Sequence, residues 1–480
     1  SAPVKVQYDD AGVLHIDCET NLDCFAAQGY FHADDRFFEM DLIRRQTRGQ
    51  LSAAVGEQAL GEDAFFRKIM TTAQGDPLEQ AYYDAASAET KEILQAYARG
   101  VNAWLADMRA EENDATLTEE YTVGLIQTDD VRDWEPQDSI ALYLQLAYQL
   151  SETAEDDLMR YEMADKLGAQ TAADLFTPKP GIESNTMQAS GVDPSTMLSG
   201  SLDPAPQASR VEQLRRAVDR FHPALGAISD ARKQFHAHPS RVFGPKFGKD
   251  GSNNWVLGGG KTASGKPLVA NDPHLSLNNP AIFYFAELDS KTNGSGNLHV
   301  AGASIPSVPG VVIGHNENIA WSITTARLDL ADAYVEELNS DGSAVIYEGS
   351  EVDIQTETFE FPLPNGETRE RTFEYVPHHG PIISKDVDAQ RAVSMRWVAQ
   401  DPGSDIDFLS NMMTASDAQE FLGSVETLRT INQNWTVADL EGTIAWYPHG
   451  AIPNRTWTDM YPNWIALPGD GTAEFQAELF

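Results

Sequence analysis

The chain has 480 residues, which is enough for two or three domains, and its 41% hydrophobic and 9% aromatic content indicates a globular protein. Its 73 acidic against 34 basic residues give a net charge of -39. Such a surface repels the phosphates of nucleic acids and of anionic lipids, which excludes both as partners. No apolar run approaches the ~20 residues that a membrane span requires.

The first part of the chain is predicted to be mostly helical. Residues 21 to about 48 place apolar side chains at near-helical spacing. A second helix is predicted from about residue 88 to 108 with Ser87 as its cap, and Pro136 is placed at the first turn of a third. The acidic residues 152–157 that follow are typical of a solvated charge run.

The composition changes between residues 190 and 251. Linker-like stretches are followed by residues 210–249, which carry nine Lys or Arg against three Asp or Glu and favour a spacer. Seven short strands are then predicted between residues 282 and 397, followed by helical stretches over 405–413 and 416–428. Helices first and strands afterwards predict packed helix and sheet layers, an α+β fold.

The stretch from Gly251 to His274 carries the candidate chemistry. Ser252 directly follows a glycine and precedes two predicted short strands and an Asn-Asp-Pro-His corner. If the Gly251–Ser252 bond breaks, Ser252 gains an α-amine with an ordinary pKa of about 7.7–8.0, which acts as the base for its own hydroxyl. The alternative is a plain hairpin that happens to begin with serine.

Two ordered strings resemble a known family. Ser-Asn-Asn-Trp-Val-Leu from Ser252, with Thr-Ala-Ser-Gly-Lys-Pro-Leu and Asn-Asp-Pro-His-Leu, resembles the start of the β-chain in the penicillin acylase family of N-terminal-nucleophile hydrolases. The segment Gln28–Met40 resembles the α-chain of that family. The resemblance implies an αββα four-layer sandwich with an α-chain-like helical part (1–189), a spacer (190–251) and the N-terminal part of a β-chain (252–480), the C-terminal remainder being expected beyond this sequence.

The resemblance also implies roles for three residues. Ser252 is the nucleophile, freed by autocatalytic cleavage after Gly251. Thr325 corresponds to the position whose backbone N–H points into the oxyanion hole. His274 corresponds to a position beside the nucleophile, where it would orient the Ser252 amine or the oxyanion; a corner histidine bonded to the backbone is the alternative. The second oxyanion donor of the family, an asparagine, is expected beyond Phe480.

A structural calcium ion is implied in the same way. Many relatives bind Ca²⁺ between the two chains through carboxylates and a carbonyl. Asp329, the carbonyl of Ala331, and Asp332 match those ligands, together with Glu155 from the helical part, and such hard oxygen ligands suit calcium. Without the resemblance, Asp329 and Asp332 are surface charges. The ion would hold the layers together and take no part in catalysis, and no organic cofactor is implied.

The predicted function is that of an amidohydrolase that cleaves the side-chain amide of a small N-acylated compound such as a β-lactam. An N-acyl homoserine lactone (quorum-quenching) acylase of the same fold is one alternative, and a non-catalytic exported binding module is another. The expected partners are the substrate and the α- and β-chains of one precursor. Because family members are usually exported, the resemblance implies a periplasmic or secreted location and favours a disulfide between Cys18 and Cys24 over two free thiols.

Overall fold

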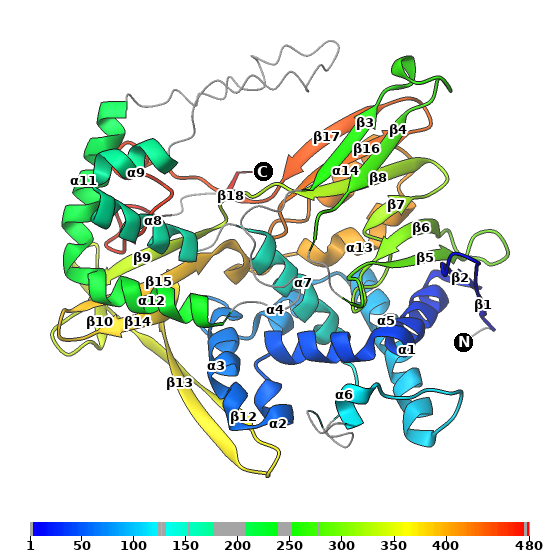
Figure 1. Cartoon of the computed structure of the whole chain (residues 1–480), viewed down its shortest axis with the longest axis horizontal. Helices are drawn as coiled ribbons and strands as arrows, with labels where there is room; N and C mark the ends of the chain where they lie inside the picture. Colours follow the sequence, from blue (N-terminus) through cyan, green and yellow to red (C-terminus); the bar gives the residue numbers. More distant parts are fainter. Residues whose placement is uncertain are drawn as a thin grey trace.

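The computed structural model describes residues 3–122, 126, 131–151, 154–176, 207–238, 252–275, 279–474 and 478–479 (Figure 1). Its helices are α1 (Asn21–Thr47), α2 (Leu51–Val55), α3 (Leu60–Ile69), α4 (Leu78–Ala85), α5 (Ala88–Ala110), α6 (Glu119–Thr122), α7 (Pro136–Leu150), α8 (Ala154–Leu167), α9 (Ala169–Phe176), α11 (Gln207–Phe221), α12 (Leu225–Ala237), α13 (Phe408–Asn411) and α14 (Ala418–Val425). The helices gather before residue 252 and the strands after it, as predicted. None of these described helices combines the length and the apolarity needed to cross a membrane.

The three long predicted helices are confirmed as α1, α5 and α7. Their starts follow local chemistry: the Ser87 hydroxyl accepts a hydrogen bond from the Thr90 N–H at 3.2 Å, and Pro136 occupies the first turn of α7. Helices α1 and α5 cross closely because both carry a glycine at the contact. A Cβ atom added at Gly100 would lie 1.7 Å from the carbonyl oxygen of Ala26, so no larger residue fits there.

Two sheets make up most of the strand structure. The eight-stranded sheet has the order β1 (Lys5–Tyr8), β2 (Leu14–Asp17), β5 (Tyr284–Asp289), β6 (His299–Ser304), β7 (Ile313–His315), β8 (Ile319–Thr325), β16 (Gln433–Asp439) and β17 (Ile444–His449). The six-stranded sheet has the order β12 (Gln355–Pro362), β13 (Thr368–Val376), β14 (Gly380–Asp386), β15 (Arg391–Trp397), β9 (Ala331–Glu337) and β19 (Leu467–Pro468). Three strand pairs stand apart: β3 (Asn253–Leu257) with β4 (Leu268–Asp272), β10 (Ala344–Tyr347) with β11 (Ser350–Asp353), and β18 (Ile452–Pro453) with β20 (Glu478–Leu479).

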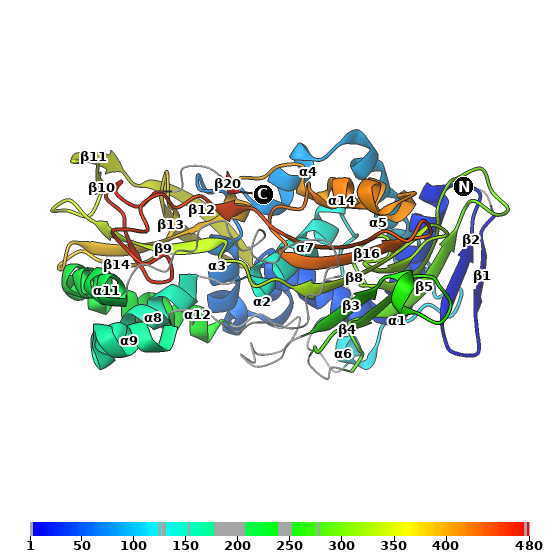
Figure 2. The same cartoon turned by 90° about the horizontal axis from the view of Figure 1, so that it is seen from above.

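Helix α14 and the hairpin β3–β4 cover opposite faces of the eight-stranded sheet. On one face the ring of Phe421 from α14 packs 5.7 Å from Trp321 of β8 and 5.6 Å from Trp435 of β16. The hairpin lies on the opposite face of the same two strands, which both views show (Figures 1 and 2). Helix, sheet and hairpin are therefore three successive layers, and the predicted α+β class is confirmed.

Part of the predicted spacer is folded. Its residues 210–221 lie in α11 and its residues 225–237 in α12. In α12 the Gln234 amide donates to the Ile383 carbonyl at 2.7 Å, and Arg232 pairs with Glu162 of α8 at 2.5 Å. Residues 177–206 and 239–251 lie outside the described residues. Of the two residues joined by the Gly251–Ser252 bond, the structure therefore describes only Ser252. The division into three parts stays a prediction.

The two cysteines are paired. Cys18 lies directly after β2 and Cys24 in the first turns of α1, and they form a disulfide with their Cα atoms 5.5 Å apart. Both are buried, so the bond ties the start of the longest helix to the eight-stranded sheet. The predicted disulfide is confirmed.

Candidate active site

Ser252 is placed by the hairpin that follows it. The register of β3 and β4 sets Asn253 opposite Asp272, which brings the corner after β4 back beside Ser252. There the backbone N–H of His274 donates a hydrogen bond to the Ser252 hydroxyl oxygen at 3.2 Å. The structure therefore brings together two of the predicted site residues.

The side chain of His274 has a different neighbour. Its Nε2 atom is 2.9 Å from Asp272 Oδ2, and the imidazole is 44% exposed. The contact to Ser252 is a backbone hydrogen bond, which any residue except proline can supply at this position. Whether the imidazole orients the amine or the oxyanion stays a prediction.

Asparagine side chains join the hairpin to the sheet. Asn271 of β4 donates to the carbonyl of Asn253 at 3.1 Å and to that of Ile323 at 2.9 Å, and its amide oxygen accepts from the Ile323 N–H at 3.1 Å. Asn254 of β3 donates to the carbonyl of Asn434 on β16 at 3.1 Å. The bonds to Ile323 and Asn434 replace ladder hydrogen bonds between the hairpin and the strands β8 and β16, with which it does not pair. They fix Ser252 relative to the end of β8.

Thr325, the third predicted residue, ends β8. In the sheet it lies opposite Gln433 of β16, and its carbonyl oxygen accepts from the Asn434 amide at 3.3 Å. Thr325 and Ser252 line the same cavity, so the structure places the predicted nucleophile and the predicted oxyanion segment at one site. The assignment of the Thr325 N–H to the oxyanion hole stays a prediction.

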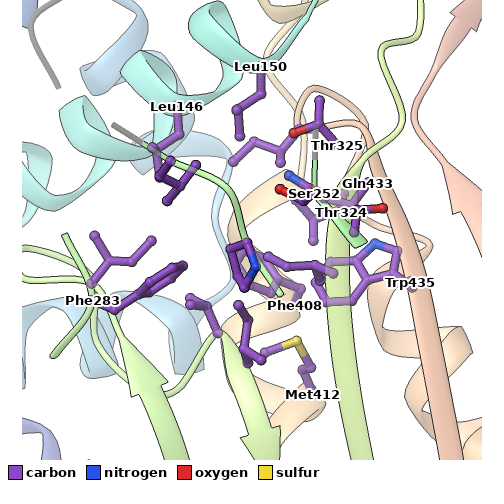
Figure 3. Close-up of a pocket in the computed structure, with 18 residues that line it drawn as sticks. Leu146, Leu150, Ser252, Phe283, Thr324, Thr325, Phe408, Met412, Gln433 and Trp435 are labelled. Carbon is purple, nitrogen blue, oxygen red and sulfur yellow. The ribbon is translucent and has the colours of Figure 1, made fainter. Parts of the chain in front are cut away.

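The cavity beside Ser252 has a volume of about 760 Å³, including the open space at its mouth. Its polar lining consists of Ser252, Thr324, Thr325 and Gln433, which Figure 3 shows together near one end. The rest of the wall is apolar: Leu146, Leu150, Pro273, Leu275, Phe283, Ile305, Val312, Ile313, Ile323, Phe408, Met412, Leu428, Ile431 and Trp435. None of the described lining residues is charged, so an apolar group fits beside a hydroxyl and a few backbone groups.

Sequence reasoning missed most of this wall. The sequence periodicity after Pro136 predicts that Ile140, Leu144, Ala147 and Leu150 share one side of the helix, but it does not say which of them faces a cavity. Leu150 lines the cavity, whereas Leu144 is completely buried in the core. The spacing of apolar residues shows which face of a helix is apolar. Whether that face packs in the core or lines a cavity depends on the tertiary fold.

The predicted calcium ligands have different partners. Asp329 and Asp332 lie together at the start of β9, where both pair with Arg455. Glu155 is near the start of α8, with its carboxylate 3.9 Å from the His236 ring. Within the described part of the chain, no group of three or more His, Cys, Asp or Glu side chains is arranged to hold a metal. The calcium site stays a prediction.

Asp157 of α8 also belongs to the cluster at β9. It is 1% exposed, so interpreting residues 152–157 as a solvated run is wrong for this residue. Burial raises the pKa of Asp157 well above its ordinary value, and the charges of Asp329 and Asp332 raise it further. Burial alone would lower the pKa of Arg455, but Asp332 and Asp329 outweigh it and raise that pKa, so the guanidinium is charged.

The helices and sheets form the α+β fold that the sequence predicts for an N-terminal-nucleophile hydrolase. The model of the penicillin amidase family matches residues 3–479, and the chain belongs to this family.

Several relatives are penicillin or homoserine lactone acylases by name. Penicillin acylase 2 proenzyme of Pseudomonas sp. (strain SE83) is 28% identical over 483 residues, covering 98% of this chain and 54% of that protein. The acyl-homoserine lactone acylase QuiP of Pseudomonas aeruginosa is 26% identical over 472 residues, with coverages of 94% and 50%. Penicillin G acylase of Escherichia coli is 25% identical over 501 residues, with coverages of 100% and 57%.

A solved structure of thermostable penicillin G acylase from Alcaligenes faecalis is 24% identical, covers 47% of this chain and 40% of that one, and has a TM-score of 0.42. The chain spans about half the length of the relatives named above.

Proposed function

We propose that this chain belongs to an amidohydrolase whose nucleophile is Ser252, freed by autocatalytic cleavage of the Gly251–Ser252 bond. One observation carries the proposal: the Ser252 hydroxyl borders an apolar cavity and already accepts a backbone N–H bond there. A serine that merely opens a hairpin has no need for an apolar cavity beside it.

The proposed reactions use the same oxygen twice. In processing, Ser252 Oγ attacks the Gly251 carbonyl carbon, and the C–N bond breaks as an ester forms, which frees the Ser252 amine. Water then hydrolyses the ester, which releases the Gly251 carboxylate and restores the Ser252 hydroxyl. In turnover, that amine takes the hydroxyl proton while Oγ attacks the substrate amide, and it passes the proton to the leaving amine. Water hydrolyses the acyl-serine. An oxyanion forms at each stage, and the Thr325 N–H is the proposed donor to it.

The apolar lining of the cavity favours a substrate whose acyl group is uncharged and apolar. Each methylene buried there contributes about 0.8 kcal/mol, whereas a carboxylate at the far end of the acyl group would lose its hydration without a charged partner among the described lining residues. Phenylacetylated β-lactams and N-acyl homoserine lactones both satisfy this condition. We therefore propose N-acyl amides with an apolar acyl group as the substrate class, with β-lactams as the first candidate and homoserine lactones as the second.

The test measures turnover by the full-length protein. Penicillin G and a series of N-acyl homoserine lactones of increasing chain length are compared with a glutaryl amide, and hydrolysis is expected only for apolar acyl groups. Ser252→Ala is expected to abolish turnover. Ser264→Ala, in the turn of the same hairpin, is the matched control and keeps it. Retained turnover in Ser252→Ala would move the nucleophile elsewhere, and binding without turnover by the wild type would favour a binding module.

We also propose that the protein is exported to the periplasm or secreted. The disulfide between Cys18 and Cys24 supports this location, because such bonds persist in oxidising compartments. Cell fractionation tests the proposal: the protein is expected outside the cytoplasm, and a cytoplasmic pool with both thiols reduced would contradict it.

A further inference from the structure

Arg455, in the loop after β18, places one nitrogen where four oxygen atoms converge. Its Nη2 atom is 3.1 Å from both carboxylate oxygens of Asp332, 3.2 Å from Asp329 Oδ2 and 3.3 Å from the backbone carbonyl of Asp329. The Nε atom adds a contact of 3.2 Å to Asp332 Oδ2. The side chain of Arg455 is 4% exposed and that of Asp332 is 0% exposed, so the pair is shielded from water.

A calcium ion at this position would need the same oxygens. Calcium takes six to eight oxygen ligands at about 2.3–2.6 Å. An ion at that distance from Asp329 and Asp332 would lie against the Arg455 nitrogen, and two cations in contact in a buried site repel each other strongly. The side chains at the start of β9 therefore do not fit calcium while Arg455 occupies its place.

The same cluster joins the helical part to the second sheet. Asp157 of α8 accepts the Ala333 N–H of β9 at 3.2 Å, and Arg160 lies 3.8 Å from its other oxygen. Asp157 also interacts electrostatically with Arg455. Asp329 and Asp332 thus share the Arg455 guanidinium, and Arg160 lies beside Asp157, so most of the negative charge is compensated by the chain itself.

We propose that Arg455 replaces the structural metal ion in this protein, holding α8 and β9 together through an internal ion-pair cluster. Arginine suits the position because its planar, permanently charged guanidinium reaches several oxygens at once. The proposal concerns how the two parts are joined, and it does not depend on the reaction at Ser252.

The first test uses the full-length wild-type protein. Its calcium content after purification in calcium-containing buffer and desalting is measured by elemental mass spectrometry, and its melting temperature is measured with EGTA and with added CaCl₂. We expect substoichiometric calcium and no shift of the melting temperature in either condition. About one calcium per chain, with a lower melting temperature in EGTA, would overturn the proposal.

A second test uses variants of Arg455 and a control variant at the surface. Arg455→Gln removes the cation from between the carboxylates, so we expect a lower melting temperature, partial recovery with CaCl₂, and new sensitised Tb³⁺ luminescence. Arg455→Lys keeps the charge, and Arg369→Gln removes a surface pair with Glu57 and Glu367; neither is expected to gain a calcium response. An Arg455→Gln protein without that gain also overturns the proposal, and if this variant does not fold, the wild-type metal content decides.

Discussion

Replacing Asn271 by alanine is expected to reduce activity far more than it reduces stability. The side chain makes three hydrogen bonds, to the Asn253 carbonyl and to both backbone groups of Ile323. At about 1 kcal/mol net for each bond, and with water replacing part of the loss, the free energy of unfolding falls by roughly 1–3 kcal/mol. Asn253 adjoins Ser252, and Ile323 lies two residues before Thr325. The amide therefore sets the separation of the proposed nucleophile and the proposed oxyanion donor, and a displacement of about 1 Å costs roughly 10²-fold in rate.

The assay compares processing, turnover and urea unfolding of the full-length protein. Asn271→Asp keeps the size of the side chain but turns an oxygen toward two carbonyl oxygens, so we expect it to be at least as impaired as alanine at neutral pH. Asn339→Ala is the control, because Asn339 bonds Ser343 and the Ala344 N–H in a turn of the other sheet. If Asn271→Ala is processed and turns over substrate at the wild-type rate, Asn271 does not position the site.

Two further changes test the electrostatics of the second sheet and the cavity wall. Burial alone would lower the pKa of His379, but Glu336 and Glu474 outweigh it and raise that pKa to about 9. This raised pKa contributes roughly 3 kcal/mol of stability below about pH 6.5, and the contribution is lost as the pH rises through 9. Urea midpoints between pH 6 and 9.5 are expected to fall in the wild type and to fall less in His379→Gln, and parallel curves would contradict the assignment. Leu150→Trp fills part of the cavity, so kcat/KM for a decanoyl amide is expected to fall roughly tenfold, the loss of about two buried methylenes, while that for an acetyl amide is unchanged. Equal losses for both amides would place the acyl group elsewhere.

Local signals in the sequence were sufficient for the three long helices α1, α5 and α7, but α2, α3, α4, α8, α9, α11 and α12 were not predicted. A capping serine at Ser87 and a proline at Pro136 mark helix starts through contacts within a few residues, and the structure has both. The strands β10, β11, β12 and β14 were not predicted. In β12 the alternation of Thr and Glu with Phe leaves most side chains exposed, so the apolar signal is weak until Phe359 and Phe361.

Contacts distant in sequence were not predictable in this way. Arg455 lies 123 residues after Asp332, and nothing near it indicates that it enters a carboxylate cluster. Glu155 and Asp157 are two residues apart on one helix and so project to nearly opposite sides, but only the packing of α8 on β9 shows which of them is buried. The hydrogen bond from the His274 backbone N–H to the Ser252 hydroxyl does not depend on the type of side chain at position 274, so the sequence does not predict it.

The central claim is tested most directly by the N-termini of the mature protein. Intact mass measurement and N-terminal sequencing of the full-length wild type are expected to show two chains, the second beginning at Ser252, while Ser252→Ala remains a single chain. A wild type that hydrolyses amides as one uncut chain would contradict the account, and so would an Ser252→Ala protein cut at the same bond at the same rate.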